Sequence, residues 1–339
     1  MKMRNSIFSL VAGLAITLSG AGFEAVADPI VIKFSHVVAV NTPKGKAAEF
    51  FKERAEALTK GQVKVEVYPN STLYKDKEEM EALQLGAVQM LAPSLAKFGP
   101  LGVKQFEVFD LPYIFDNYAE LHKVTQGPIG AQMLGLLESK GVKGLAFWDN
   151  GFKSFSANTP LRAPGDFRGL KLRIQSSKVL DAQMRALGAL PQVMAFSEVY
   201  QALQTGVVDG TENPISNLYT KKMHEVQKHL TLSNHGYLGY AVITNKKFWD
   251  GLPADIRAKL QQAMNEATDY ANKIAQQEND EALEAVRKSG KTVVYSPTMQ
   301  EKNALKKALV PVHTKMDDRV GLELVNTIYK ETGFDPSKL

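Results

Sequence analysis

The residues best suited to binding chemistry stand at the ends of predicted strands. In Gly169–Ser177 (GLKLRIQSS), apolar residues alternate with Lys171 and Arg173, a period of two that predicts a strand with one buried face. Arg173 ends this strand, and polar residues and a helix follow. A guanidinium offers two parallel N–H donors to a carboxylate, so Arg173 is a candidate anion-binding residue. The alternative is a solvated cation on the outer face of the sheet.

A second polar cluster occurs in Val207–Pro214 (VVDGTENP). We interpret its valines as the end of a strand, Asp209-Gly210 as a turn and the proline as the start of a helix. Ligands bind at the carboxyl ends of strands in open α/β sheets, which makes Asn213 a second candidate. Capping of the helix by Asn213 is the alternative. Lys153 follows a predicted crossing between two lobes and would add a third polar group to the same cleft.

The chain lacks the common signatures of catalysis. It has no G-x-S-x-G elbow, no phosphate-binding G-x-x-x-x-G-K-[ST], no H-E-x-x-H and no G-x-G-x-x-G after a strand. The six histidines show no zinc-binding arrangement. We therefore expect no enzyme activity, no cofactor and no metal. An acid–base set of Asp209, Glu212 and His235 is the catalytic alternative, although nothing in the sequence brings these residues together.

The N-terminal residues predict export. Lys2 and Arg4 precede an apolar run, 7–18, that is too short to span a bilayer, and Ala25-Val26-Ala27 forms an A-x-A cleavage site. Residues 1–27 are thus predicted to be a signal peptide, with a retained membrane anchor as the alternative. The chain has no cysteine, which excludes disulfides and an acylated-cysteine tether. We expect a soluble protein of the periplasm.

Charge and length limit the remaining classes of protein. The formal net charge is +5 and the basic residues are scattered, so nucleic acid is not an expected partner. About 312 residues remain after cleavage, which exceeds the usual size of a single core and favours two lobes.

Apolar strand-like runs alternate with helical ones, which predicts an α/β fold. Predicted strands cover 30–35, 62–68, 88–92, 143–148, 154–157, 170–174, 190–194, 207–210 and 237–245. Predicted helices cover 44–60, 77–85, 177–187, 197–204 and 253–288, with others starting near Tyr118 and Gly130. The last helix is long enough to brace both lobes, with two helices broken near 269–272 as the alternative. We assign 28–150 and 239–278 to lobe I, 151–238 and 279–330 to lobe II, and 331–339 to a C-terminal tail.

Several phrases occur in order along the chain: IVIKFSHVVAVNTPKGKAAEFF, LGAVQMLAPSLAKFGP, FEVFDLPYIF, GDFRGLKLRIQSS, MAFSEVYQALQTGVVDGTENP and FWDGLPADIR. Together they resemble the solute-binding proteins of tripartite ATP-independent periplasmic (TRAP) transporters, the DctP family, over essentially all of the chain after residue 27. The resemblance implies a two-lobed periplasmic binding protein fold with hinge strands and a long helix spanning both lobes.

The resemblance also implies roles for single residues. Arg173 would pair with a substrate carboxylate, Asn213 would support the same ligand, and Phe196 would pack on it. Lys153 stands where the family often has a second arginine, and a lysine keeps the charge but lacks the planar two-pronged donor.

A second carboxylate would need a second cation. Lys44, at a predicted helix start, is the candidate, together with His36 and Ser94. An exposed helix-start lysine and a strand-end histidine are the alternatives. Trp148 and Tyr237 complete the predicted substrate-binding set.

The expected function is capture of an organic acid, with a C4-dicarboxylate such as malate, succinate or fumarate as the first choice. The cleft would close on the anion and deliver it to a permease of small and large membrane subunits, and the protein would act as a monomer. One alternative is a TRAP binding protein for a 2-oxo acid or a sugar acid. The other is a periplasmic sensor partner that presents its ligand to a receptor.

Overall fold

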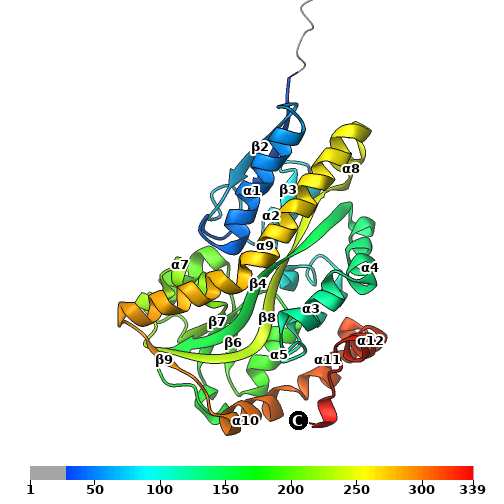
Figure 1. The fold of residues 1–339 in the computed structure, drawn as a ribbon. Coiled ribbons are helices and arrows are strands. Elements are labelled where there is room, and N and C mark those ends of the chain that lie inside the picture. The colour runs from blue at the N-terminus through cyan, green and yellow to red at the C-terminus, as the bar shows by residue number, and fades with distance from the viewer. Residues whose placement is uncertain (1–27, 339) are drawn as a thin grey trace, which may run out of the picture.

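The computed structural model describes residues 28–338. The predicted signal peptide lies outside these residues. A single mixed sheet runs through the protein, with the strand order β2-β1-β3-β8-β4-β7-β5-β6 and with β9 paired to β8 (Figure 1). Its strands are β1 Ile30–Ser35, β2 Val63–Tyr68, β3 Met90–Leu91, β4 Val142–Ala157, β5 Lys171–Ile174, β6 Leu190–Val193, β7 Gly210–Asn213, β8 His229–Asn245 and β9 Val293–Tyr295.

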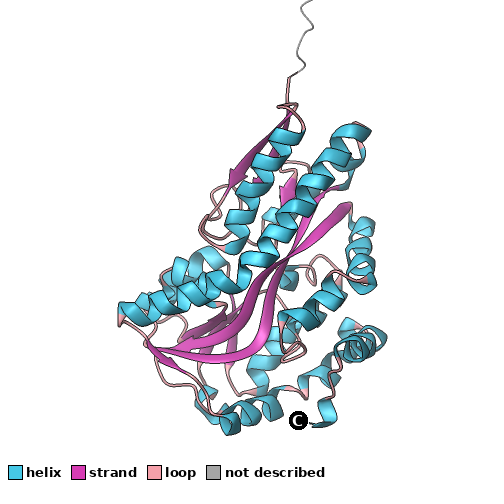
Figure 2. Ribbon diagram, viewed as in Figure 1, coloured by secondary structure: helices cyan, strands magenta, loops and turns pink. Residues whose placement is uncertain are grey.

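Helices cover both faces of this sheet (Figure 2). They are α1 Pro43–Leu58, α2 Glu79–Gln84, α3 Tyr118–Thr125, α4 Pro128–Leu136, α5 Lys178–Ala186, α6 Val199–Gln204, α7 Ile215–Thr220, α8 Lys246–Asp250, α9 Ala254–Ser289, α10 Met299–Leu309, α11 Val312–Val320 and α12 Leu322–Thr332. None of the helices within residues 28–338 is both apolar enough and long enough to cross a bilayer.

The two long strands β4 and β8 pair antiparallel and join two lobes. Strands β1 to β3 lie on one side of this pair in the strand order, and β5 to β7 lie on the other. We predicted separate strands at 143–148 and 154–157, which is wrong, because β4 is continuous over 16 residues. Register shifts at Gly144/Ala146, Asp149/Gly151 and Lys153/Phe155 let the strand bend without ending.

The long helix α9 confirms the prediction of one helix across both lobes, and the two-helix alternative is wrong. It has 36 residues and is therefore about 54 Å long (Figure 1). Ala263, Ala267, Ala271 and Ala275 form a buried row at intervals of four, which lets α1 and β4 approach closely. At Gly151 of β4, an added Cβ would lie 2.8 Å from the side chain of Asn279 on α9. A larger residue here would have to displace the amide group of Asn279, which donates to the Asn150 carbonyl oxygen.

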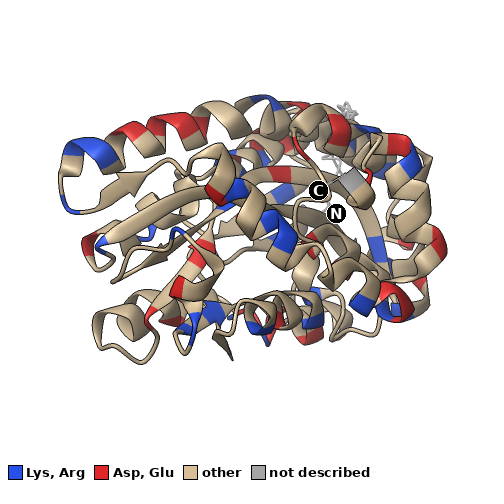
Figure 3. Cartoon of the chain, turned by 90° about the horizontal axis from the view of Figure 1, so that it is seen from below, with Lys and Arg blue, Asp and Glu red and all other residues tan. Residues whose placement is uncertain are grey.

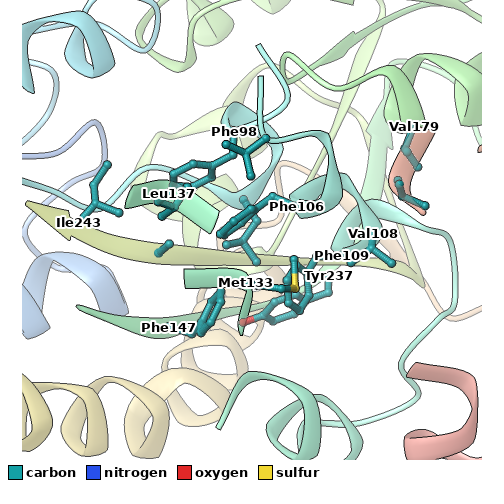
Figure 4. Close-up of a cluster of buried hydrophobic side chains, with 14 of the residues drawn as sticks. Phe98, Phe106, Val108, Phe109, Met133, Leu137, Phe147, Val179, Tyr237 and Ile243 are labelled. Carbon is teal, nitrogen blue, oxygen red and sulfur yellow. The ribbon is translucent and has the colours of Figure 1, made fainter. Parts of the chain in front are cut away.

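Aromatic side chains fill the core on one face of β4 and β8. Phe106 and Phe109 come from a 3₁₀ segment, Lys104–Asp110, and contact Phe147 of β4 (Figure 4). On the other face, Trp148 packs 6.0 Å from Phe34, ring centre to ring centre, beneath α1 and α9. The two faces of β4 are thus both buried.

The strand at the DG turn lies later than predicted. We expected it at 207–210, but Gly210 begins β7, and Thr211, Glu212 and Asn213 are strand residues. Gly206 turns the chain with a φ of 73°, and the pairing of β7 with β4 and with β5 begins only at Gly210. The first residue of α7 follows Pro214, and no side chain caps that helix, so the capping alternative for Asn213 is not observed.

The helices after α9 were not individually predicted. Helix α12 packs against α3, and α11 packs against Lys104–Asp110 and α5. The C-terminal helices therefore contact elements that we assigned to both lobes. The proposed lobe boundaries remain a prediction.

Candidate functional site

A small cavity lies between the two lobes and next to the β4–β8 pair. Its empty volume is about 280 Å³. Five of the nine predicted site residues line it: Lys44, Ser94, Arg173, Phe196 and Asn213. They come from α1, from the segment after β3, from β5, from the segment after β6 and from the end of β7. Residues far apart in the sequence thus meet at one place.

Arg173 is buried in this cavity wall, with 3% of its surface exposed. Leu172, Arg173 and Ile174 are all buried because helices cover both faces of the sheet, so the solvated-cation alternative is wrong. The guanidinium donates from Nε and Nη2 to the carbonyl oxygen of Met194, at 3.1 and 2.9 Å. It lies 5.8 Å from the ring centre of Phe196. Burial lowers the pKa of Arg173, against the opposing effect of nearby carboxylates.

Lys44 is also buried, with 1% of its surface exposed. Thr42 caps α1 by accepting a hydrogen bond from Gly45, and this fixes Lys44 in the first turn. The ammonium donates to the carbonyl oxygen of Ala92 at 2.9 Å and lies 3.8 Å from the ring centre of Tyr240. Burial, and then the positive charge of Lys97, lowers the pKa of Lys44 to about 7. The exposed-lysine alternative is therefore wrong.

A third buried cation, Lys97, lines the cavity and was missed by the sequence analysis. Its ammonium forms ion pairs with Asp76 and with Glu79, the latter at 2.6 Å. Burial raises the pKa of Asp76, but the ion pair with Lys97 outweighs this effect and lowers it to about 2. No local sequence signal marks this group, because Lys97 is 18 residues from its nearer partner in the chain.

Neutral polar groups also line the cavity. Gln175 donates from Nε2 to the hydroxyl of Ser94 at 2.6 Å, which joins the two lobes across the cavity. Asn213 donates from Nδ2 to the hydroxyl of Thr211 at 3.3 Å. These amides and hydroxyls are suited to bind the oxygens of a small polar ligand.

The other predicted site residues do not line the cavity. Lys153 donates to Glu212 at 3.0 Å, Trp148 donates to Thr268 at 2.9 Å, and Tyr237 donates to Asp149 at 2.6 Å. His36 is fully buried, and burial together with the charge of Lys44 lowers its pKa to about 3. Lys153, Trp148 and Tyr237 thus form hydrogen bonds within the protein, and His36 is enclosed by it. Their roles as ligand contacts stay predictions.

Glu212, the partner of Lys153, belongs to a buried network of ion pairs that the sequence analysis did not predict. Glu212 binds Lys153 through Oε1 and His235 through Oε2, each at 3.0 Å. Burial raises the pKa of Glu212, but Lys153 and His235 lower it below its usual value. Asp209, the third member of the acid–base alternative, instead accepts a hydrogen bond from the Lys171 amide at 2.7 Å. The structure therefore brings two of those three residues together, away from the cavity.

The chemistry of the cavity is that of an anion site. Lys44 and Arg173 each use a neutral carbonyl as acceptor, and neither forms an ion pair within residues 28–338. A buried cation without a counter-ion is costly, and an anionic ligand would offset that cost. In the same described range, no three His, Cys, Asp or Glu side chains are grouped to hold a metal ion.

Known proteins are similar to this chain in sequence. The profile of the family described as bacterial extracellular solute-binding protein, family 7 (DctP), matches residues 34–319. The C4-dicarboxylate-binding periplasmic protein DctP of Rhodobacter capsulatus is 65% identical over 332 residues, which cover 98% of this chain and 99% of that protein.

Solved structures share the fold. A TRAP periplasmic solute-binding protein from Sulfurospirillum deleyianum with bound succinate has a TM-score of 0.86 and 46% identity, and the match covers 88% of this chain and 98% of that one. A second, from Pseudomonas aeruginosa with bound L-malate, has a TM-score of 0.83 and 44% identity, over 85% of this chain and 100% of that one. The fold of this chain is thus a known one. The chain is a TRAP transporter solute-binding protein of the DctP family, family 7 of the bacterial extracellular solute-binding proteins.

Proposed function

We propose that the protein binds a C4-dicarboxylate such as succinate, malate or fumarate, with one carboxylate on Arg173 and the other on Lys44. The observation that carries this proposal is that these two buried cations, from opposite sides of the β4–β8 pair, have only neutral acceptors among the described residues. The third cation, Lys97, already has Asp76 and Glu79 as counter-ions. Two unpaired cations match a ligand with two negative charges.

The lining of the cavity supports a small ligand with polar groups. Ser94, Gln175 and Asn213 add hydrogen-bonding groups to the two cations, and Phe196 supplies an apolar wall. The C4-dicarboxylates named for the similar proteins agree with this combination of charge and polar lining.

The remaining steps follow from the transporter class. After removal of residues 1–27, the protein acts in the periplasm as a monomer that carries its ligand and performs no catalysis. Strands β4 and β8 act as hinges between lobe I (28–150 and 239–278) and lobe II (151–238 and 279–330). The closed form docks on a permease of small and large membrane subunits. Figure 3 shows Lys and Arg positions interspersed with Asp and Glu positions along the ribbon, and the proposal includes no nucleic-acid partner.

A thermal-shift screen of residues 28–339 tests the substrate, after unfolding and refolding have removed any ligand carried from the host. Succinate, malate and fumarate should raise the melting temperature, because a ligand that binds only the native state stabilises it. Butyrate, which has the chain length of succinate but one carboxylate, is the matched control. An equal shift with butyrate, or a larger one with sugar acids, would contradict the C4-dicarboxylate assignment.

A further inference from the structure

We propose that Asp76 is a positioning residue: when the lobes close, its carboxylate binds the amide of Phe196 and so fixes the carbonyl group that orients Arg173. We call the pair of Asp76 and the Phe196 amide the closure latch. The inference rests on the proposed role of Arg173 as the carboxylate-binding residue.

The closure latch joins distant parts of the sheet. Asp76 lies in the segment after β2, and Phe196 lies in the segment after β6. These are the two outermost strands of the strand order. The Phe196 amide donates to Oδ2 of Asp76 at 2.5 Å. This contact requires the two lobes to be close together, so it can form only in a closed state.

The carboxylate of Asp76 is held in place and kept charged. Its other oxygen, Oδ1, pairs with Lys97, which is itself buried and also paired with Glu79. The pKa of Asp76 is about 2, so the group is ionised at neutral pH. A hydrogen bond from an amide to an ionised acceptor is stronger than one between neutral groups.

The partner segment is short and connects directly to Arg173. The carbonyl oxygen of Met194 accepts both guanidinium hydrogen bonds, and the Phe196 amide lies two residues later. The segment 194–196 is therefore held at one end by Arg173 and at the other by Asp76. Loss of the second contact would free the segment, and the guanidinium would lose its fixed acceptor.

The start of the 3₁₀ helix Phe196–Glu198 gives an independent reason for an external acceptor. Its own N-cap residue is Ala195, which provides no side-chain hydrogen bond. The free amides at a helix start need an acceptor, and here Asp76 supplies it from 120 positions earlier in the chain. In an open state, this amide has no acceptor of its own in the local sequence.

A neighbouring contact offers a matched control. Lys75 and Glu198 form an ion pair at 3.4 Å between the same two segments, but both side chains are about half exposed, at 51% and 52%. Exposed pairs of this kind contribute little, because water and salt screen them. Removing Glu198 therefore takes away a contact between the same segments without touching the closure latch.

The test compares the wild-type protein with D76A, D76N and E198A. Isothermal titration with succinate gives the affinity, and stopped-flow displacement gives the dissociation rate. We expect D76A to weaken binding about tenfold to a hundredfold, with a faster dissociation rate and an association rate within about twofold of wild type. D76N, which keeps an oxygen acceptor, should recover part of the loss. E198A should match wild type.

Hydrogen exchange at the Phe196 amide of the wild-type protein provides a readout that needs no variant. Saturating succinate should slow exchange at this amide. A purely structural role of Asp76 would lower the melting temperature of D76A without a selective change in the dissociation rate.

The two proposals fail in different ways. A wild-type protein that shows no thermal shift with any C4-dicarboxylate contradicts the proposed function. Succinate binding that depends on Arg173 but leaves D76A with the wild-type dissociation rate, or an exchange rate at Phe196 unaffected by succinate, contradicts the closure latch alone.

Discussion

Lys44 and Arg173 line one cavity from opposite sides of the β4–β8 pair, and each donates its hydrogen bonds to a main-chain carbonyl group. The acceptors are Ala92 and Met194. Neither cation forms an ion pair in the part of the chain that the structure describes, although both are buried. The free protein therefore holds two desolvated basic side chains that can receive an anion, and most of the testable consequences follow from this arrangement.

Replacing Arg173 by Ala should abolish the main carboxylate contact. Each charge-assisted hydrogen bond contributes about 1.5–3 kcal/mol, so the loss of a two-pronged contact should weaken succinate binding by roughly a hundredfold or more. R173K should recover only part of this, because an ammonium lacks the planar fork. Isothermal titration measures both. Wild-type affinity in R173A, with its melting temperature intact, would contradict the assigned role.

Replacing Lys44 by Met should raise the stability of the ligand-free protein while it impairs recognition of dicarboxylates. The folded pKa of about 7 lies below the usual 10.5, so the unfolded chain binds more protons between these values. The buried charge of Lys44 therefore lowers the free energy of unfolding at neutral pH and below. This destabilisation decreases as the pH rises toward 10.5. K44M should raise the melting temperature of the ligand-free protein, by about 2 °C for each kcal/mol gained.

The same variant should lose selectivity for dicarboxylates. With one cation left, K44M should bind succinate and butyrate with similar affinity. Calorimetry of the ligand-free protein and titration with the two acids test the paired outcome. A lower melting temperature together with unchanged preference for succinate would refute it.

Succinate binding should weaken as the pH rises above about 7. In the free protein Lys44, with a pKa of about 7, loses most of its charge over this range, whereas a bound carboxylate favours the charged form and raises its pKa. Binding should thus take up protons, up to one per ligand. Titrations in two buffers of different ionisation enthalpy, between about pH 7 and about pH 9, measure this uptake. K44M serves as the control and should show no pH dependence in this range; a wild-type protein without proton uptake would contradict the prediction.

Replacing Lys153 by Met should reduce stability more than binding. Lys153 is the buried partner of Glu212, and removal of one member of a buried ion pair costs about 3–5 kcal/mol. Denaturant unfolding should show this loss, with K171M, at an exposed position of β5, as the matched control. If Lys153 contacts the ligand instead, K153M will weaken succinate binding as strongly as R173A does.

Local sequence patterns determined much of the fold. The alternation of apolar residues located β1, β2 and β5, and the absence of Gly and Pro from α9 predicted one long helix. Patterns of this kind depend on a few neighbouring residues, which is why they can be read from the chain alone. The breaks predicted within β4 and the early end predicted for β7 were wrong, because bulges and strand pairing depend on partners that lie far away in the sequence.

The candidate site likewise has features that the sequence determined and features that depend on the folded structure. The sequence by itself determined that Arg173 and Asn213 stand at strand ends of one lobe, and that a cation at Lys44 begins a helix in the other. Only the tertiary structure decided which cations remain unpaired. Lys97 and Lys153 have carboxylate partners from distant segments, whereas Lys44 and Arg173 form no ion pair with any residue of 28–338. Ion pairing depends on distances of a few ångströms between side chains, and these distances exist only once the chain has folded.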